Sequence, residues 1–210
     1  VAKKVADRLQ VKWSFVEVNH KIMKDYYKSS TYEKYLRFSE SYGATPVSHE
    51  LAALDAIKKL GHMSDAIIVN GQTGDFITGG HIPSGGELFE ERAQKALFSK
   101  EYIVQHLISK HFSLWQSFLT PRDREKLSVT LSDTIQELVG STSKKIESNH
   151  TIIEWFDWKY RQGKYLMGNQ RVYDFYDFDW RLPLWDAELM DFWEQRSLEE
   201  RIDQKLFKKM

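Results

Sequence analysis

The residues best suited to chemistry follow one another closely in the first half of the chain, directly after a short apolar run. Asn70 and Gly71 come first, Gly74 and the carboxylate of Asp75 follow, and residues 79–80 are two further glycines. Glycine lets bare backbone approach a ligand, and open α/β sheets bind nucleotides at such turns after a strand. The pattern therefore predicts a nucleotide-binding turn. An alternative use of Asp75 is to cap the helix after the turn.

A strand must hold this turn in place, and the preceding residues predict one. Residues 66–69 are apolar and β-branched, which is typical of a buried strand. Upstream, the patterns predict a helix over 2–9, a strand over 13–18, helix over 21–42 with a break near 29–31, and a helix from an N-cap at Ser48 to Gly61. Helices that separate two strands indicate a parallel sheet. Because two parallel strands do not make a stable sheet, we expect a further strand outside these 210 residues.

Downstream of the turn the pattern is helical, with predicted helices over 87–98, 102–118, 122–138 and 152–160. The predicted fold class is α/β with predominant helix: a partial Rossmann-like parallel sheet followed by a helical C-terminal region. We expect one domain, with residues 1–85 as its nucleotide-binding part and 86–210 as its helical part.

Composition limits the possible classes of protein. The chain has 210 residues, is 41% hydrophobic, and balances 30 basic against 30 acidic residues. This neutral balance argues against a nucleic-acid partner. No apolar run reaches the roughly 20 residues of a membrane span, so we expect no membrane partner. With no cysteine, disulfides and thiolate chemistry are excluded, and a cytoplasmic location is expected. The histidines lack paired metal-ligand spacing, and no zinc site is predicted.

Aromatic residues are concentrated between residues 154 and 193, which hold nearly half of those in the chain. Such residues at helical spacing most often form a packed core. Aromatic rings interleaved with Asp and Arg can also line a pocket for a sugar or a base. Composition alone leaves both interpretations open.

Three blocks in the same order resemble the synthetase domain of asparagine synthetase, an ATP-pyrophosphatase-type amidotransferase with an adenine nucleotide alpha hydrolase-like fold. Residues 2–18 resemble the helix and strand after the family's phosphate loop. Residues 70–80, Asn-Gly-Gln-Thr-Gly-Asp-Phe-Ile-Thr-Gly-Gly, resemble its Ser-Gly-(Glu/Gln)-Gly-x-Asp-Glu-x-x-Gly-Gly block. Residues 179–186 resemble Glu-x-Arg-x-Pro-Phe-Leu-Asp, which a helix and a lysine follow. The resemblance covers nearly the whole chain.

The resemblance implies a reaction in which ATP adenylates a carboxylate and ammonia then displaces AMP to leave an amide. It implies ATP and Mg²⁺ as cofactors, a small carboxylate acceptor (aspartate or a sugar derivative), and ammonia from solution or from a glutaminase domain or subunit. By position, Asp75 corresponds to the magnesium ligand, and Asn70 and Gly71 border the α-phosphate and ribose. Lys205 corresponds to the lysine over the acyl-phosphate, and Gln72 lies near the acceptor. Gly74 belongs to the same cofactor-binding turn.

Several residues depart from the family pattern. No Ser-Gly-Gly-x-Asp-Ser phosphate loop is present, and the similar letters at 84–86 lack its Asp and final Ser. We expect the loop to precede Val1, so this chain alone is expected to be incomplete for catalysis. Phe76 stands where an acidic residue usually follows Asp75. Lys205 lies close to Lys208 and other lysines, which is equally typical of a solvated helix face.

These departures leave other functions open. One is a divergent amidotransferase for surface-polysaccharide sugars. Another is a non-catalytic binding or scaffold relative, and a third is a carbohydrate-binding helical module built on the aromatic cluster.

Overall fold

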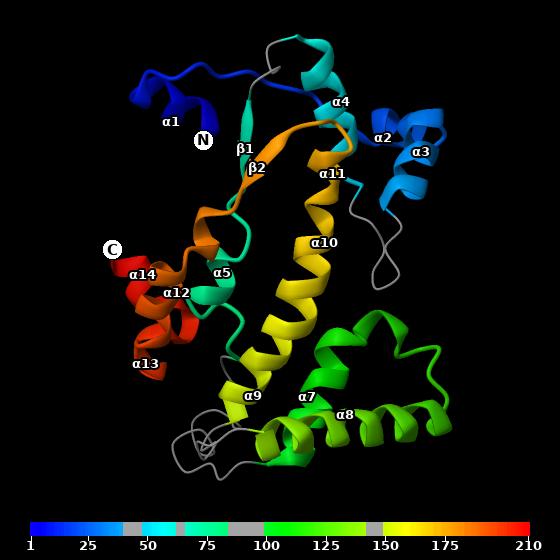
Figure 1. Cartoon of the computed structure of the whole chain (residues 1–210), viewed down its shortest axis with the longest axis vertical. Coiled ribbons are helices and arrows are strands. Elements are labelled where there is room, and N and C mark those ends of the chain that lie inside the picture. The colour runs from blue at the N-terminus through cyan, green and yellow to red at the C-terminus, as the bar shows by residue number, and fades with distance from the viewer. Residues whose placement is uncertain (40–47, 62–65, 84–98, 142–148) are drawn as a thin grey trace. The chain divides into compact units, whose positions relative to one another are not determined.

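The computed structural model describes residues 1–39, 48–61, 66–83, 99–141 and 149–210 (Figure 1). Helices predominate in these residues, and the only strands they contain are two short ones that pair in parallel. The chain divides into two compact units, which are described separately. The first comprises Val1–Asn70 and Gly163–Pro183, and the second comprises Gly71–Gln162 and Leu184–Met210. The helix-dominated fold with a small parallel sheet confirms the broad prediction.

The first unit contains α1 (Ala2–Leu9), α2 (His20–Tyr26), α3 (Ser30–Ser39), α4 (Leu51–Lys59), β1 (Ile67–Val69), α10 (Met167–Asn169), α11 (Arg171–Asp174) and β2 (Asp179–Arg181). The second contains α5 (Gly74–Ile77), α7 (Lys100–His111), the 3-10 turn η1 (Ser113–Trp115), α8 (Pro121–Ser141), α9 (Asn149–Phe156), α12 (Ala187–Glu194), α13 (Leu198–Arg201), η4 (Ile202–Gln204) and α14 (Lys205–Lys209). The π-helix η2 (Asp157–Leu166) and the 3-10 turn η3 (Pro183–Trp185) cross the boundary in sequence.

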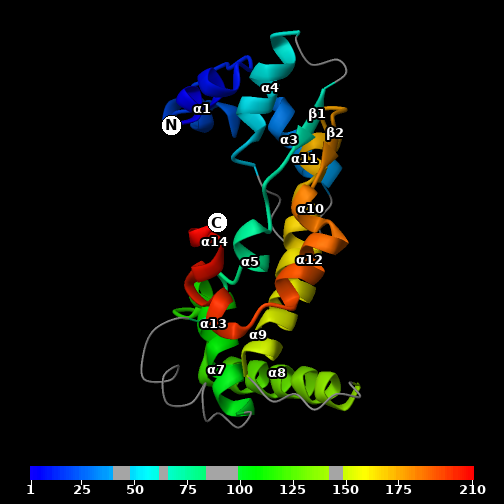
Figure 2. The same ribbon diagram turned by 90° about the vertical axis from the view of Figure 1, so that its left-hand side faces the viewer.

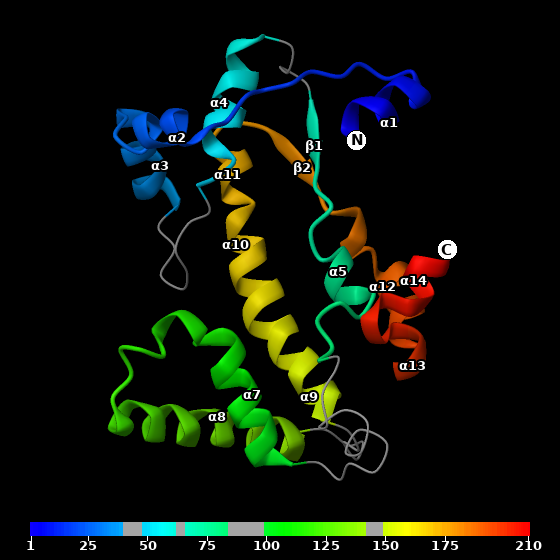
Figure 3. The same cartoon turned by 180° about the vertical axis from the view of Figure 1, so that it is seen from behind.

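The sheet of the first unit pairs β1 with β2, which lie side by side in Figure 3. Ile67 faces Asp179 and Val69 faces Arg181, and the ladder extends to a bond from the Asn70 N–H to the Arg181 carbonyl (3.0 Å). A strand is thus confirmed at residues 67–69, but its predicted burial is wrong, because Ile67 and Val69 are 50% and 67% exposed. Its partner was not predicted as a strand, because three residues give too short a pattern.

The predicted strand at residues 13–18 is wrong. These residues form an irregular segment between α1 and α2 (Figure 1), and Phe15 is 72% exposed. β-branched and aromatic residues favour a strand only where a neighbouring strand supplies hydrogen bonds. The described residues supply no such neighbour to this segment.

The helical predictions agree in position more than in length. The break near residues 29–31 is confirmed by the separation of α2 from α3, and Gly61 has a φ of 68° directly after α4. Ser48 is not the N-cap of α4, because Glu50 occupies that position and the Ser48 hydroxyl bonds the Tyr27 hydroxyl (3.4 Å).

In the second unit, α7 ends at residue 111 rather than 118. The helix that begins with α9 runs on into η2, past the predicted end at residue 160. The predicted helix over 87–98 and the predicted division after residue 85 lie outside the described residues.

Most of the aromatic cluster of the sequence forms core. In the first unit the buried core consists of Tyr35, Leu51, Leu54, Val172, Tyr173, Tyr176 and Phe178. In the second unit α7, α8 and α9 lie beside one another (Figure 3). These three helices bury one apolar cluster, and Phe76, Ile77 and Trp193 form another. No helix in the described part of the chain has both the length and the apolar character to cross a membrane.

Candidate functional site

The turn after β1 begins with Asn70, the last residue of the first unit. Its amide Nδ2 donates to the Tyr173 hydroxyl (2.7 Å), which in turn donates to the Glu50 carboxylate (2.7 Å). Burial, together with the hydrogen bond to Glu50, raises the pKa of Tyr173, so the hydroxyl stays protonated and remains a donor. The Asn70 side chain is therefore held by two residues, Glu50 and Tyr173, that no sequence pattern connected with it.

The second unit begins with the glycine-bearing turn, and Thr73 fixes that turn. Thr73 is buried and has a φ of 76°, which a β-branched residue rarely adopts. Its hydroxyl donates to Gln162 Oε1 (2.9 Å) and accepts from Trp185 Nε1 (2.8 Å). Backbone strain of this kind persists where the surroundings enforce it, often at functional sites. The turn is thus rigid immediately before α5.

Asp75 lies in the first turn of α5 with a largely exposed side chain (62%). Its Oδ1 accepts from the Phe76 N–H (2.9 Å), and its Oδ2 lies 2.9 Å from Nε2 of His81. The N-cap of α5 is Thr73, so Asp75 is not the capping residue that the alternative interpretation required. The carboxylate is accessible to solvent and yet held in place by His81.

His81 connects Asp75 to a buried carboxylate. Its Nδ1 lies 2.5 Å from Oδ2 of Asp157, and Arg161 Nη1 lies within 3.2 Å of both ring nitrogens. Each ring nitrogen therefore faces a carboxylate oxygen. No sequence signal pointed to His81, because its partner Asp157 is 76 residues away along the chain.

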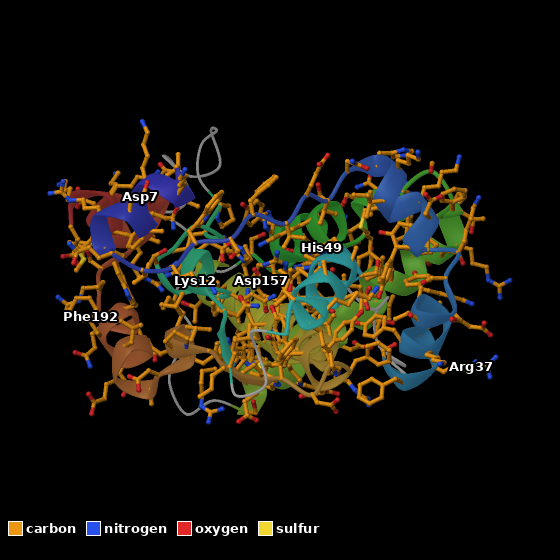
Figure 4. The ribbon with its side chains drawn as sticks, turned by 90° about the horizontal axis from the view of Figure 1, so that it is seen from above. Asp7, Lys12, Arg37, His49, Asp157 and Phe192 are labelled. Carbon is orange, nitrogen blue, oxygen red and sulfur yellow. The ribbon has the colours of Figure 1, made fainter. Side chains whose placement is uncertain are left out.

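Asp157, labelled in Figure 4, is fully buried at the start of η2. The ammonium of Lys110 lies 3.0 Å from its Oδ2, and His111 Nε2 lies 3.7 Å from its Oδ1. Burial alone would raise the pKa of Asp157, but the bonds and charges of His81 and Lys110 outweigh it and lower the pKa to about 2. Asp157 is therefore ionised at neutral pH and fixes the orientation of His81.

The remaining predicted site residues of the turn differ in their surroundings. Gly71 is exposed with open space around it, whereas a side chain at Gly74 would meet Leu184 Cδ1 at 2.7 Å. Gln72 is half-buried. The turn thus offers open backbone at Gly71 and close packing at Gly74.

Gly79 and Gly80 allow the segment that leads into α14, the helix of Lys205, to pack closely against the end of α5, the helix of Asp75. Gly79 has a φ of 94°, and a Cβ there would lie 2.2 Å from the Arg201 carbonyl oxygen. A Cβ on Gly80 would lie 3.2 Å from Gln204 Cδ, and Gln204 Nε2 donates to Thr78 Oγ1 (2.6 Å). The start of α14 is therefore anchored beside α5, as Figure 2 shows. Lys205, the first residue of α14, is exposed there.

A metal site formed by protein side chains alone does not occur among the described residues, which contain no group of three or more His, Asp or Glu suited to one. A single exposed carboxylate fits Mg²⁺ in a different way. Mg²⁺ keeps several waters and is often bound by one or two carboxylates together with substrate phosphates. Asp75 meets that requirement, whereas Phe76, where the family pattern has an acid, is buried in the core.

No family model, curated protein or solved structure matches this chain.

Proposed function

We propose that this chain forms part of a cytoplasmic, ATP-dependent amide-forming ligase of the asparagine synthetase type. The observation that carries the proposal is the exposed carboxylate of Asp75, held by His81 directly after a strained, glycine-bearing turn. That turn follows β1, the strand of a parallel pair, and ligands of open α/β sheets bind beyond the carboxyl ends of strands.

In the proposed site, Asp75 is the magnesium ligand. The metal, when bound, neutralises the charge that develops on the polyphosphate. Asn70 and Gly71 border the α-phosphate and ribose, and Gly74 belongs to the same turn. The family pattern has glycine at the position of Thr73, which agrees with the positive φ found there.

Lys205 stabilises the charge of the acyl-phosphate, and Gln72 contacts the acceptor in this proposal. Support for Lys205 comes from the close packing of Gly79 and Gly80 against Arg201 and Gln204, because it anchors the start of α14 beside α5. The glycine pair thus has a structural role, because larger residues at these positions would push the start of α14 away from α5.

The proposal includes a larger Rossmann-like sheet, of which β1 and β2 are two strands. The side chains of Ile67 and Val69 on β1 are 50% and 67% exposed, which is unusual for the apolar face of a parallel strand. In this proposal the sheet gains a further strand, which brings it to a stable size.

A non-catalytic relative is the second candidate, and Phe76 favours it. The side chain stacks on Trp158 (ring centroids 6.0 Å apart) and belongs to the core. A position that supplies an acid in the family pattern is used here for packing. Such a relative would bind Mg-ATP without releasing pyrophosphate.

The experiment uses the full-length protein. Pyrophosphate release from Mg-ATP is measured with ammonia and either aspartate or an acidic sugar as acceptor. Acceptor-dependent release supports the ligase, and ATP binding without release supports the non-catalytic relative. Lys205→Ala is expected to lower the rate at least about a hundredfold, whereas Lys209→Ala at the far end of α14 serves as the matched control. Equal rates for the two variants would remove Lys205 from the site.

A further inference from the structure

A cavity of about 680 Å³ lies within the second unit and is not part of the site proposed for ATP. Its walls come from α5, α9, η2, α12 and α13, and the lining residues do not include Asp75, His81 or Lys205. The volume suits a small-molecule ligand.

Four aromatic rings line this cavity: Phe76, Trp155, Trp158 and Trp193. The faces of such rings carry partial negative charge and attract cations. One cation is already bound in this way, because Lys159 Nζ lies 4.8 Å from the centre of the Trp155 ring. The aromatic wall therefore favours a positively charged ligand over a negatively charged one.

The cations that line the cavity are already engaged. Arg201 forms a two-bond ion pair with Glu154 (2.9 and 2.7 Å), and both side chains are nearly buried. The guanidinium of Arg196 lies 4.7 Å from the centre of the Phe192 ring, and its Nε donates to the Phe192 carbonyl. Both guanidiniums keep their positive charge, but the three carboxylates of the lining, Glu154, Asp191 and Glu194, outnumber them.

The carboxylates of α12 are differently placed. Asp191 and Glu194 are three residues apart, line the same cavity and are exposed. Within the described part of the chain neither has an ion-pair partner. Burial, with the charge of Arg201, lowers the pKa of His150 to about 4, so this histidine of the lining is neutral at pH 7. The cavity consequently carries net negative charge.

We propose that this cavity binds an organic cation, an alkylammonium or guanidinium group carried on an apolar stem. Asp191 and Glu194 supply the opposite charge. The faces of the aromatic rings contact the cationic group and its apolar stem. A nucleotide would place its phosphates beside these carboxylates, and a neutral sugar would leave both of them without a counter-charge.

The test is titration calorimetry of the full chain with choline, with its uncharged carbon isostere dimethylbutanol, and with agmatine as a guanidinium probe. Choline or agmatine is expected to bind at least about tenfold more tightly than dimethylbutanol. Binding is also expected to weaken as salt is added, because the carboxylates are exposed. Glucose and AMP are measured in parallel as the neutral sugar and the anion.

Variants then assign the binding to this cavity. Asp191→Asn combined with Glu194→Gln is expected to weaken cation binding about tenfold, while Glu188→Gln, on the same helix but outside the lining, leaves it unchanged. Both substitutions are at exposed positions, and circular dichroism checks that the fold is retained. The proposal is overturned if neither cation binds, if AMP or glucose binds more tightly, or if the double variant binds as the unaltered chain does.

Discussion

Thr73 is the residue on which the geometry of the glycine-bearing turn depends. Its positive φ is unfavourable for a β-branched side chain, by about 1–3 kcal/mol. Its hydroxyl offsets that cost through bonds to Gln162 and Trp185, two groups that would otherwise lack a partner there. The hydrogen bonds of Thr73 therefore fix the backbone conformation two residues before Asp75.

Substitutions of Thr73 test whether its hydroxyl stabilises the turn. Thr73→Val keeps the shape but removes both hydrogen bonds, and we expect it to lower the free energy of unfolding by about 2 kcal/mol or more. Thr73→Ser keeps the hydroxyl and relieves the β-branch, so its effect is expected to stay within about 1 kcal/mol. Urea denaturation measures both. Equal stability of the two variants would contradict the role given to the hydroxyl.

Asp157 is a second single residue with a large expected effect, because its buried charge orients His81 and pairs with Lys110. Asp157→Asn removes that charge and leaves Lys110 beside a neutral amide, which we expect to cost about 2–3 kcal/mol of folding free energy. Asp133→Asn, at an exposed position of α8, is the control and should change stability by less than about 0.5 kcal/mol.

The pKa of Asp157 adds a pH dependence to this prediction. Since the folded-state pKa is lowered to about 2 from an ordinary 3.8, its contribution to stability is complete above pH 4 and is lost as the pH falls toward 2. Asp157→Asn should flatten the stability curve in that interval. An unchanged slope between pH 4 and 2 would show that another carboxylate controls acid unfolding.

At the scale of elements, the glycine pair after α5 decides how closely the C-terminal helices approach. Gly79→Ala would force a Cβ to within 2.2 Å of the Arg201 backbone at a φ of 94°, and we expect a loss of about 3 kcal/mol or more. Gly140→Ala, in α8 with open space around it, is the matched control and should leave stability equal or raise it by up to about 1 kcal/mol. Thermal unfolding measures the midpoint of each variant. Equal shifts of the two midpoints would contradict the close packing at Gly79.

Elements with a local signal were predictable from sequence, and those with a distant partner were not. The strand at residues 67–69, the break between α2 and α3 and the end of α4 two residues before Gly61 follow from residues adjacent in the chain. The strand β2 and the failure of residues 13–18 to form one depend on which segment supplies the neighbouring ladder. Of the site, the turn and Asp75 were visible in the sequence. The contacts of His81 with Asp157 and of Asn70 with Tyr173 were not, because they join residues far apart in sequence.

At the scale of the whole molecule, the second unit keeps His111 and His150 neutral at pH 7. Burial lowers the pKa of His111 and of His150 to about 4 from an ordinary 6.5. Folding therefore disfavours the protonated form of each. Their contribution to stability is complete above about pH 6.5 and is lost as the pH falls toward 4.

We expect the unfolding midpoint of the chain to decrease over that interval, and His150→Gln to reduce the decrease. His49→Gln is the control, because the His49 side chain is 73% exposed. Thermal unfolding followed by circular dichroism between pH 7 and 4 provides the measurement. A decrease of the same size in both variants would mean that burial of His150 does not govern it.

The most direct test of the proposed function is pyrophosphate release by Asp75→Ala in the full-length protein. Because the Asp75 side chain is largely exposed, the variant is expected to fold normally, with an unfolding midpoint close to that of the unaltered protein. Its Mg-ATP-dependent pyrophosphate release should fall at least about a hundredfold. Release at the unaltered rate from a folded variant would contradict the assignment of Asp75 to the metal and, with it, the ligase proposal.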